Sequence, residues 1–95
     1  MSDVLVEMVN EKESAFVFEV QVNEGSSSTN HTVTVPKDYY RDLAPEGVGA
    51  KMLIEESFEF LLEREPKESI LSSFDLPTIS SYFPEYEEKI THRLS

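Results

Sequence analysis

The sequence contains no cysteine among its 95 residues. Disulfides, thiolate metal sites, cysteine nucleophiles and thiol redox chemistry are therefore excluded. No stretch approaches the ~20 consecutive apolar residues that a membrane-spanning helix needs, and the N-terminus lacks the basic and apolar regions of a secretory signal. We therefore expect a cytoplasmic protein that has no membrane partner.

Basic residues are also scarce. Eight Lys and Arg stand against nineteen Asp and Glu, which gives a net charge of −11 and a pI near 4.4. Phosphate backbones are bound mainly by Lys and Arg, so the excess of acid argues against a nucleic-acid partner. We expect a protein partner, either a basic protein or a second copy of this chain.

Motifs that carry catalysis or bind cofactors are missing. The three glycines form neither a dinucleotide-binding fingerprint nor a phosphate-binding loop, and the serines stand in no nucleophile motif. The two histidines, His31 and His92, have no second ligand at metal-binding spacing, and we expect both to be exposed. The sequence thus predicts no catalytic residue, no metal ligand and no cofactor, and the protein is expected not to be an enzyme.

The first third of the chain shows the period-2 alternation of half-buried strands. Residues 16–22 alternate apolar and polar side chains most clearly, and residues 4–9 and 31–35 repeat the pattern more weakly. The polar segment 23–30 is predicted to be a mobile loop. Residues 1–36 are therefore predicted to form a three-stranded antiparallel β-meander.

After Pro36 the period of the apolar residues changes to that of helices. Residues 37–43 predict a short helix, and residues 48–65 predict a long central helix whose apolar stripe includes Ile54 and Phe58. Prolines at 66, 77 and 84 each mark a place where a further short helix can begin. We predict one α+β domain over residues 1–95, with the meander in 1–36 and several short helices around one long helix in 37–95.

Aromatic and acidic residues suggest a surface for a partner. Aromatic residues are enriched at interaction hot spots, and an acidic stripe at helical spacing complements a basic partner. The alternative is that the aromatic side chains fill the core. The candidate partner surface consists of Tyr39, Tyr40, Tyr82, Tyr86, Glu55, Glu59 and Glu63.

Several segments of the last two-thirds of the chain resemble a known group. They are the PKDYY run at 36–40, the SFEFLLEREPKESIL run at 57–71, the FDLP run at 74–77 and the YFPEY run at 82–86. In these runs the chain resembles a group of short uncharacterised prokaryotic proteins. The resemblance implies a free-standing prokaryotic domain in the cytoplasm, and it carries no activity, ligand or functional residue over to this chain.

Three functions follow as hypotheses. The first is a small acidic interaction module without enzymatic activity, acting as a monomer or a homodimer. The second is a domain that binds or transforms a small molecule in a pocket between sheet and helices, lined by Phe58, Tyr39, Tyr40 or Tyr82. The third is an antitoxin-like neutraliser of a basic protein.

Overall fold

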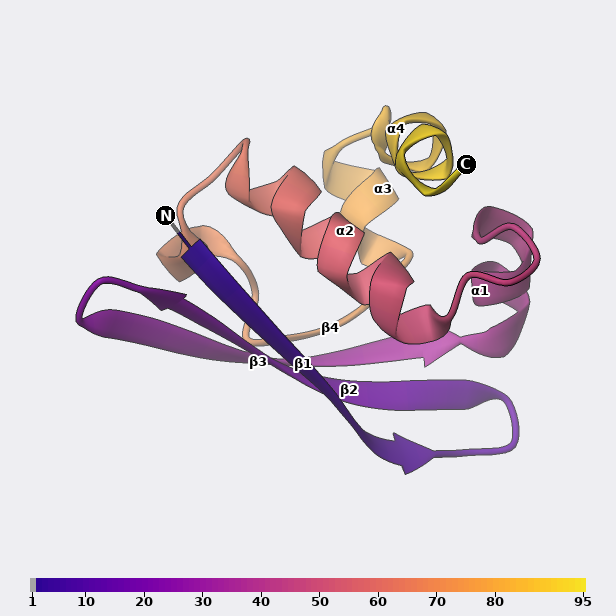
Figure 1. Cartoon of the computed structure of the whole chain (residues 1–95), viewed down its shortest axis with the longest axis horizontal. Helices are drawn as coiled ribbons and strands as arrows, with labels where there is room; N and C mark the ends of the chain where they lie inside the picture. Colours follow the sequence, from indigo (N-terminus) through magenta and orange to yellow (C-terminus); the bar gives the residue numbers. More distant parts are fainter. Residues whose placement is uncertain (1) are drawn as a thin grey trace.

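In the computed structural model, which describes residues 2–95, helices cover one face of a twisted four-stranded sheet (Figure 1). The elements in chain order are β1 (Ser2–Glu11), β2 (Ala15–Glu24), β3 (Ser27–Pro36), α1 (Lys37–Leu43), α2 (Ala50–Leu62), the 3₁₀ turn η1 (Lys67–Ser69), β4 (Ser73–Asp75), α3 (Thr78–Tyr82) and α4 (Tyr86–Leu94). The predicted α+β class is confirmed.

The first three strands form the predicted antiparallel meander, in the order β1-β2-β3. The predicted mobile loop at 23–30 is wrong. Its residues continue both strands, and only Gly25 and Ser26 remain as a two-residue turn. Gly25 has a φ of 62°, a left-handed conformation that favours glycine in tight hairpins.

The sheet has a fourth strand that the sequence did not predict. The three residues of β4 pair parallel with β3, Val33 lying opposite Phe74. The backbone continues this contact on both sides, because the Thr32 N–H donates to the Ser72 carbonyl at 2.8 Å and the Leu76 N–H donates to that of Thr34 at 2.9 Å. The region 37–95 is therefore not purely helical: the segment after Pro66 is a 3₁₀ turn followed by extended chain.

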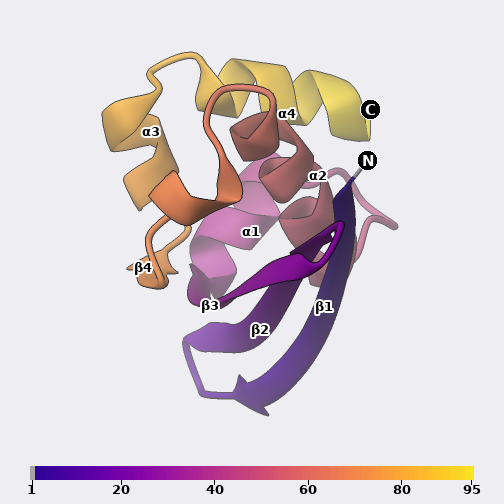
Figure 2. The same ribbon diagram turned by 90° about the vertical axis from the view of Figure 1, so that its left-hand side faces the viewer.

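The helical layer contains the central helix and three shorter ones. The helix predicted at 37–43 is α1, while the central helix α2 is shorter than the predicted 48–65. The segments after Pro77 and Pro84 form the helices α3 and α4. Turning the molecule by 90° shows that the helices lie on one side and leave the other face of the sheet open (Figure 2).

The core lies between the inner face of the sheet and α2. Residue pairs in register place Phe18, Val20 and Val22 of β2 on this face, with Val33 and Val35 of β3 beside them. The facing side of α2 contributes Ile54, Phe58 and Leu61, and its flank toward α4 contributes Leu53, Ser57 and Phe60. Because α2 is covered on two sides, its apolar residues occupy more of its circumference than in a surface helix.

Candidate functional site

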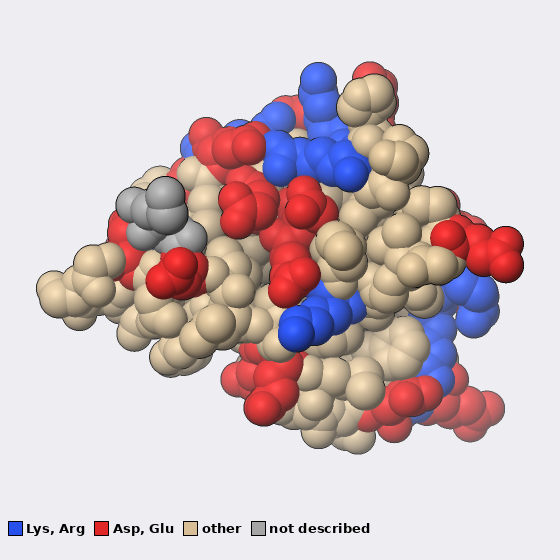
Figure 3. All heavy atoms as spheres, viewed as in Figure 1, with Lys and Arg blue, Asp and Glu red and all other residues tan. Residues whose placement is uncertain are grey.

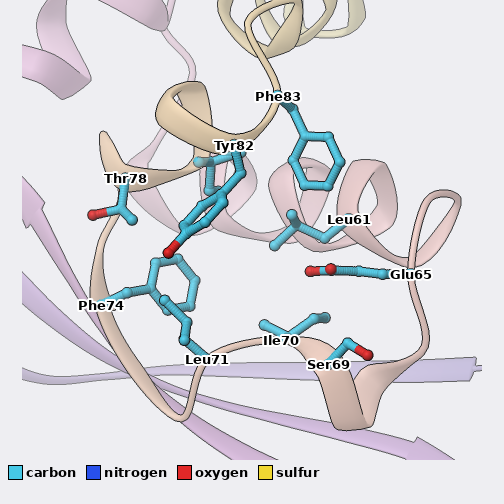
Figure 4. Close-up of a pocket in the computed structure, with 10 residues that line it drawn as sticks. Leu61, Glu65, Ser69, Ile70, Leu71, Phe74, Thr78, Tyr82 and Phe83 are labelled. Atoms are coloured by element: carbon cyan, nitrogen blue, oxygen red, sulfur yellow. The ribbon is translucent and has the colours of Figure 1, made fainter.

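An open groove of about 300 Å³ with a mainly apolar lining lies at the C-terminal end of α2. Its walls come from four neighbouring segments: the end of α2, the turn η1, the extended chain through β4, and α3 (Figure 4). The lining residues are Leu61, Glu65, Ser69, Ile70, Leu71, Phe74, Thr78, Ile79, Tyr82 and Phe83. This volume is at the lower end of the range for ligand pockets, so the groove has room for one or two side chains.

One carboxylate reaches into this apolar groove. Glu65 extends from the chain after α2, and its oxygens lie between Leu61 and Ile70 and point toward the middle of the lining (Figure 4). Within residues 2–95 the Glu65 carboxylate makes no ion pair. The adjacent Arg64 is occupied elsewhere, because it contacts Glu63 and Glu85 and lies 3.6 Å above the Phe60 ring centre. The groove thus offers an apolar surface beside an uncompensated negative charge.

The turn η1 is fixed by a buried lysine. Lys67 Nζ donates a hydrogen bond to Glu68 at 2.5 Å and lies 3.7 Å from Glu24 at the β2–β3 turn. The hydrogen bond to Glu68 raises the pKa of the lysine, a shift that burial opposes, and Glu24 raises it further. This lysine joins the groove wall at Ser69 and Ile70 to the end of the sheet.

A second link to the sheet comes from His31. The sequence prediction that His31 is exposed is wrong: the side chain is 2% exposed and lies on the inner face of β3, opposite Val20. Its Nδ1 lies 2.7 Å from the Leu71 carbonyl oxygen, and Nδ1 is the donor because a carbonyl oxygen can only accept. Its other ring nitrogen, Nε2, lies 2.9 Å from Thr29 Oγ1. The ring also packs on the Phe58 ring, and the two ring centres are 5.4 Å apart. His31 therefore positions Leu71 at the rim of the groove.

The four tyrosines proposed for a partner surface do not form one exposed surface. Tyr86 is fully buried, so it belongs to the core and not to a surface. Tyr40 is half-buried, packs on Phe16 and donates a hydrogen bond to the Val48 carbonyl. Tyr39 is also half-buried, whereas Tyr82 is 67% exposed and is the one of the four that lines the groove.

Two of these tyrosines tie helices together through their hydroxyl groups. Tyr39 donates to Glu87 at 2.8 Å and joins α1 to α4, while Tyr86 Oη lies 2.6 Å from Ser57 Oγ and joins α4 to α2. Burial, with help from the Glu87 hydrogen bond, raises the pKa of Tyr39 far above its usual value. Burial also raises the pKa of Tyr86, although the hydrogen bond with Ser57 opposes this. Both residues are held neutral by the fold.

Alkaline solution is therefore expected to destabilise the protein. An unfolded chain ionises its tyrosines near pH 10, whereas the folded chain keeps Tyr39 and Tyr86 protonated, so their contribution to stability is present below about pH 10 and is lost above it. Urea denaturation at pH 8 and at pH 11 measures the loss. The double variant Tyr39→Phe/Tyr86→Phe is expected to lose less stability over this interval than the unmodified protein. An equal loss in both would contradict the assignment.

The acidic stripe of α2 is only partly free. Glu63 is paired with Arg93 at 2.5 Å, and the hydrogen bond from Arg93 lowers the pKa of Glu63. Glu55 and Glu59 have no ion pair among residues 2–95. Figure 3 shows acidic side chains gathered across the middle of the face that it draws. None of the three lines the groove.

Most groove residues were missed by the sequence reasoning. The segment after Pro66 was predicted to begin a short helix, but it forms the 3₁₀ turn η1 and extended chain. Leu71 is 46% exposed. The available signal was the charged residue Glu65 directly before Pro66, at a point where the helical pattern ends. The predicted pocket between sheet and helices is also wrong about Phe58, which is fully buried in the core.

No group of three or more Asp, Glu, His or Cys side chains within residues 2–95 is arranged to hold a metal ion. Within the same range no helix has the length and apolar character needed to cross a membrane.

No family model, no curated protein and no solved structure matches the chain. The resemblance to short prokaryotic proteins stays a prediction.

Proposed function

We propose that the protein is a small acidic interaction module without enzymatic activity, and that its groove binds a basic segment of a protein partner. The observation that carries this proposal is the Glu65 carboxylate, which points into an apolar groove and makes no ion pair within residues 2–95. The best complement is an apolar side chain next to a Lys or Arg. The apolar group would fill the space between Leu71 and Phe83, and the cation would pair with Glu65.

The chemistry of the lining favours binding over catalysis. The groove presents one carboxylate and three hydroxyl groups, from Ser69, Thr78 and Tyr82. The other lining residues are apolar, which suits an apolar side chain of a partner. Tyr82 and Leu71 are exposed at the groove, and tyrosine is enriched among the residues that dominate binding at interfaces.

The net charge of −11 supports the same choice of partner. A field of one sign attracts a basic molecule over a distance of about 10 Å at 0.1 M salt and accelerates its association. A neutraliser of a basic protein is one form of this function.

Titration with a short capped peptide tests the proposal. A peptide with leucine next to arginine is expected to bind, with the chemical shifts of Leu71 and Phe83 changing on binding. Glu65→Gln is expected to weaken binding about three- to tenfold. This loss lies between the contribution of an exposed ion pair and that of a hydrogen bond to a charged group. The matched control is Glu59→Gln, which changes the net charge equally but lies outside the groove. Equal losses in the two variants would show that binding depends on overall charge and not on the groove.

A further inference from the structure

A second part of the molecule also exposes apolar side chains. Among residues 2–95 the exposed large hydrophobic residues fall mainly into two groups: Leu71 and Tyr82 at the groove, and three residues of β1. Leu5, Met8 and Val9 of β1 are each about half exposed, at 55%, 49% and 49%. Isolated exposed apolar residues are ordinary, but three on one strand are more than scattered surface residues.

The strand β1 is an open edge of the sheet. It is ten residues long and pairs with β2 on one side only. The opposite edge of the sheet is β4, whose three residues offer little length for an added strand. On its free side β1 presents backbone N–H and C=O groups to solvent, and such an edge accepts an added strand.

Charge decides which strand fits this edge. Within Ser2–Glu11 there are three carboxylates and no Lys or Arg. Glu11 is paired with Lys37 at 2.8 Å, whereas Asp3 and Glu7 have no ion pair among residues 2–95. Glu7 also lies directly opposite Glu19 of β2, and like charges in this position repel each other. The edge therefore lacks cations that a partner can supply.

A second copy of the chain fits this edge poorly. A β1–β1 pair would double the number of uncompensated carboxylates along the shared edge, in a chain that already carries a net charge of −11. The irregularity in pairing between Met8 and Asn10 also bends the strand there, which shortens the length available for regular pairing. Natural proteins use charges and bulges of this kind to keep edges from pairing with themselves.

We propose that β1 binds an extended basic segment of a partner, which adds to the sheet as a further strand with Lys or Arg beside Asp3 and Glu7. Its backbone pairs with the free side of β1. Its basic side chains lie on the face that Asp3, Leu5 and Glu7 share, where their aliphatic stems cover Leu5, and its apolar side chains lie on the opposite face beside Met8. The site is separate from the groove, since no residue of β1 lines the groove. The proposal does not depend on the function assigned to Glu65.

A capped seven-residue peptide that alternates lysine and valine is the probe. We expect it to bind, to slow hydrogen exchange of β1 amides that are not bonded to β2, and to bind more weakly as salt is raised. The same peptide with proline in place of the central valine keeps the charge but loses strand pairing, and is expected to bind at least fivefold more weakly. Equal binding of both peptides would overturn the proposal.

Variants of the protein locate the site. Glu7→Lys is expected to weaken peptide binding about tenfold, whereas Glu46→Lys makes the same charge change at an exposed position between α1 and α2 and is expected to have a much smaller effect. Glu65→Gln is expected to leave this peptide's affinity unchanged, so failure at the edge and failure at the groove are distinguishable. Light scattering without peptide completes the test, because a stable dimer that Glu7→Lys strengthens would assign the edge to a second copy instead.

Discussion

Replacing Phe58 with alanine is expected to lower the free energy of unfolding by about 3–5 kcal/mol. The ring is fully buried between α2 and the sheet. Its centre lies 5.4 Å from the ring centre of His31 and 6.2 Å from that of Phe74. Removal of the ring leaves a cavity whose walls belong to three elements, so it cannot collapse easily. A chain of this length has about 5–14 kcal/mol of stability in all, so the loss is a large share of the total.

Urea denaturation followed by circular dichroism measures this effect. Tyr82→Ala removes an aromatic side chain that is mostly exposed and serves as the control, with an expected change within about 0.5 kcal/mol. If Phe58→Ala does not fold, Phe58→Leu is measured instead, with an expected loss of about 1–1.5 kcal/mol. A loss in Phe58→Ala no larger than that in Tyr82→Ala would contradict the buried position of the ring.

Replacing His31 with alanine is expected to cost about 2–4 kcal/mol. The Leu71 carbonyl loses its donor, which costs about 1–3 kcal/mol if the group stays buried, and the missing ring leaves a cavity beside Phe58. The rim of the groove is expected to loosen at the same time, because the bond to His31 is a direct tie between Leu71 and β3. Binding of the leucine–arginine peptide should weaken in parallel.

Thr29→Val is the matched control for His31. It removes the contact between Thr29 and Nε2 but keeps the donation from Nδ1 to Leu71, and we expect a loss of about 1 kcal/mol. Hydrogen exchange of the Leu76 amide, which donates to Thr34, reports whether β4 has loosened. Faster exchange is expected in His31→Ala and not in Thr29→Val. Identical exchange in both variants would show that the bond to Leu71 does not hold β4.

The strands of the meander were predictable because alternation of polar and apolar residues is a local signal. The same alternation places His31 on one face with Val33 and Val35, and it therefore indicated that His31 is buried. The polarity of histidine was the reason for predicting exposure instead. The partner that makes this burial stable is the Leu71 carbonyl, 40 positions along the chain. A sequence pattern does not identify a backbone partner at that distance.

The groove was harder to predict because its walls are short and irregular. The three residues of β4 are too few to show a period, and parallel pairing with β3 is set by the docking of the chain. The apolar Leu71 is exposed, whereas Tyr86, which was proposed for a surface, is buried. Whether either side chain is buried depends on which helix covers it, and the sequence does not show this. Glu65 was visible as a charge in the sequence, but its direction into the groove is a property of the fold.

The parallel pairing of β4 with β3 also sets an order of assembly. Thr32 and Ser73 are 41 residues apart, whereas the meander is built from neighbouring hairpins. Contacts between distant residues form later than local ones, so we expect the meander to be complete before β4 docks. During synthesis, a partner that needs the groove therefore meets a competent surface only after the last quarter of the chain has left the ribosome.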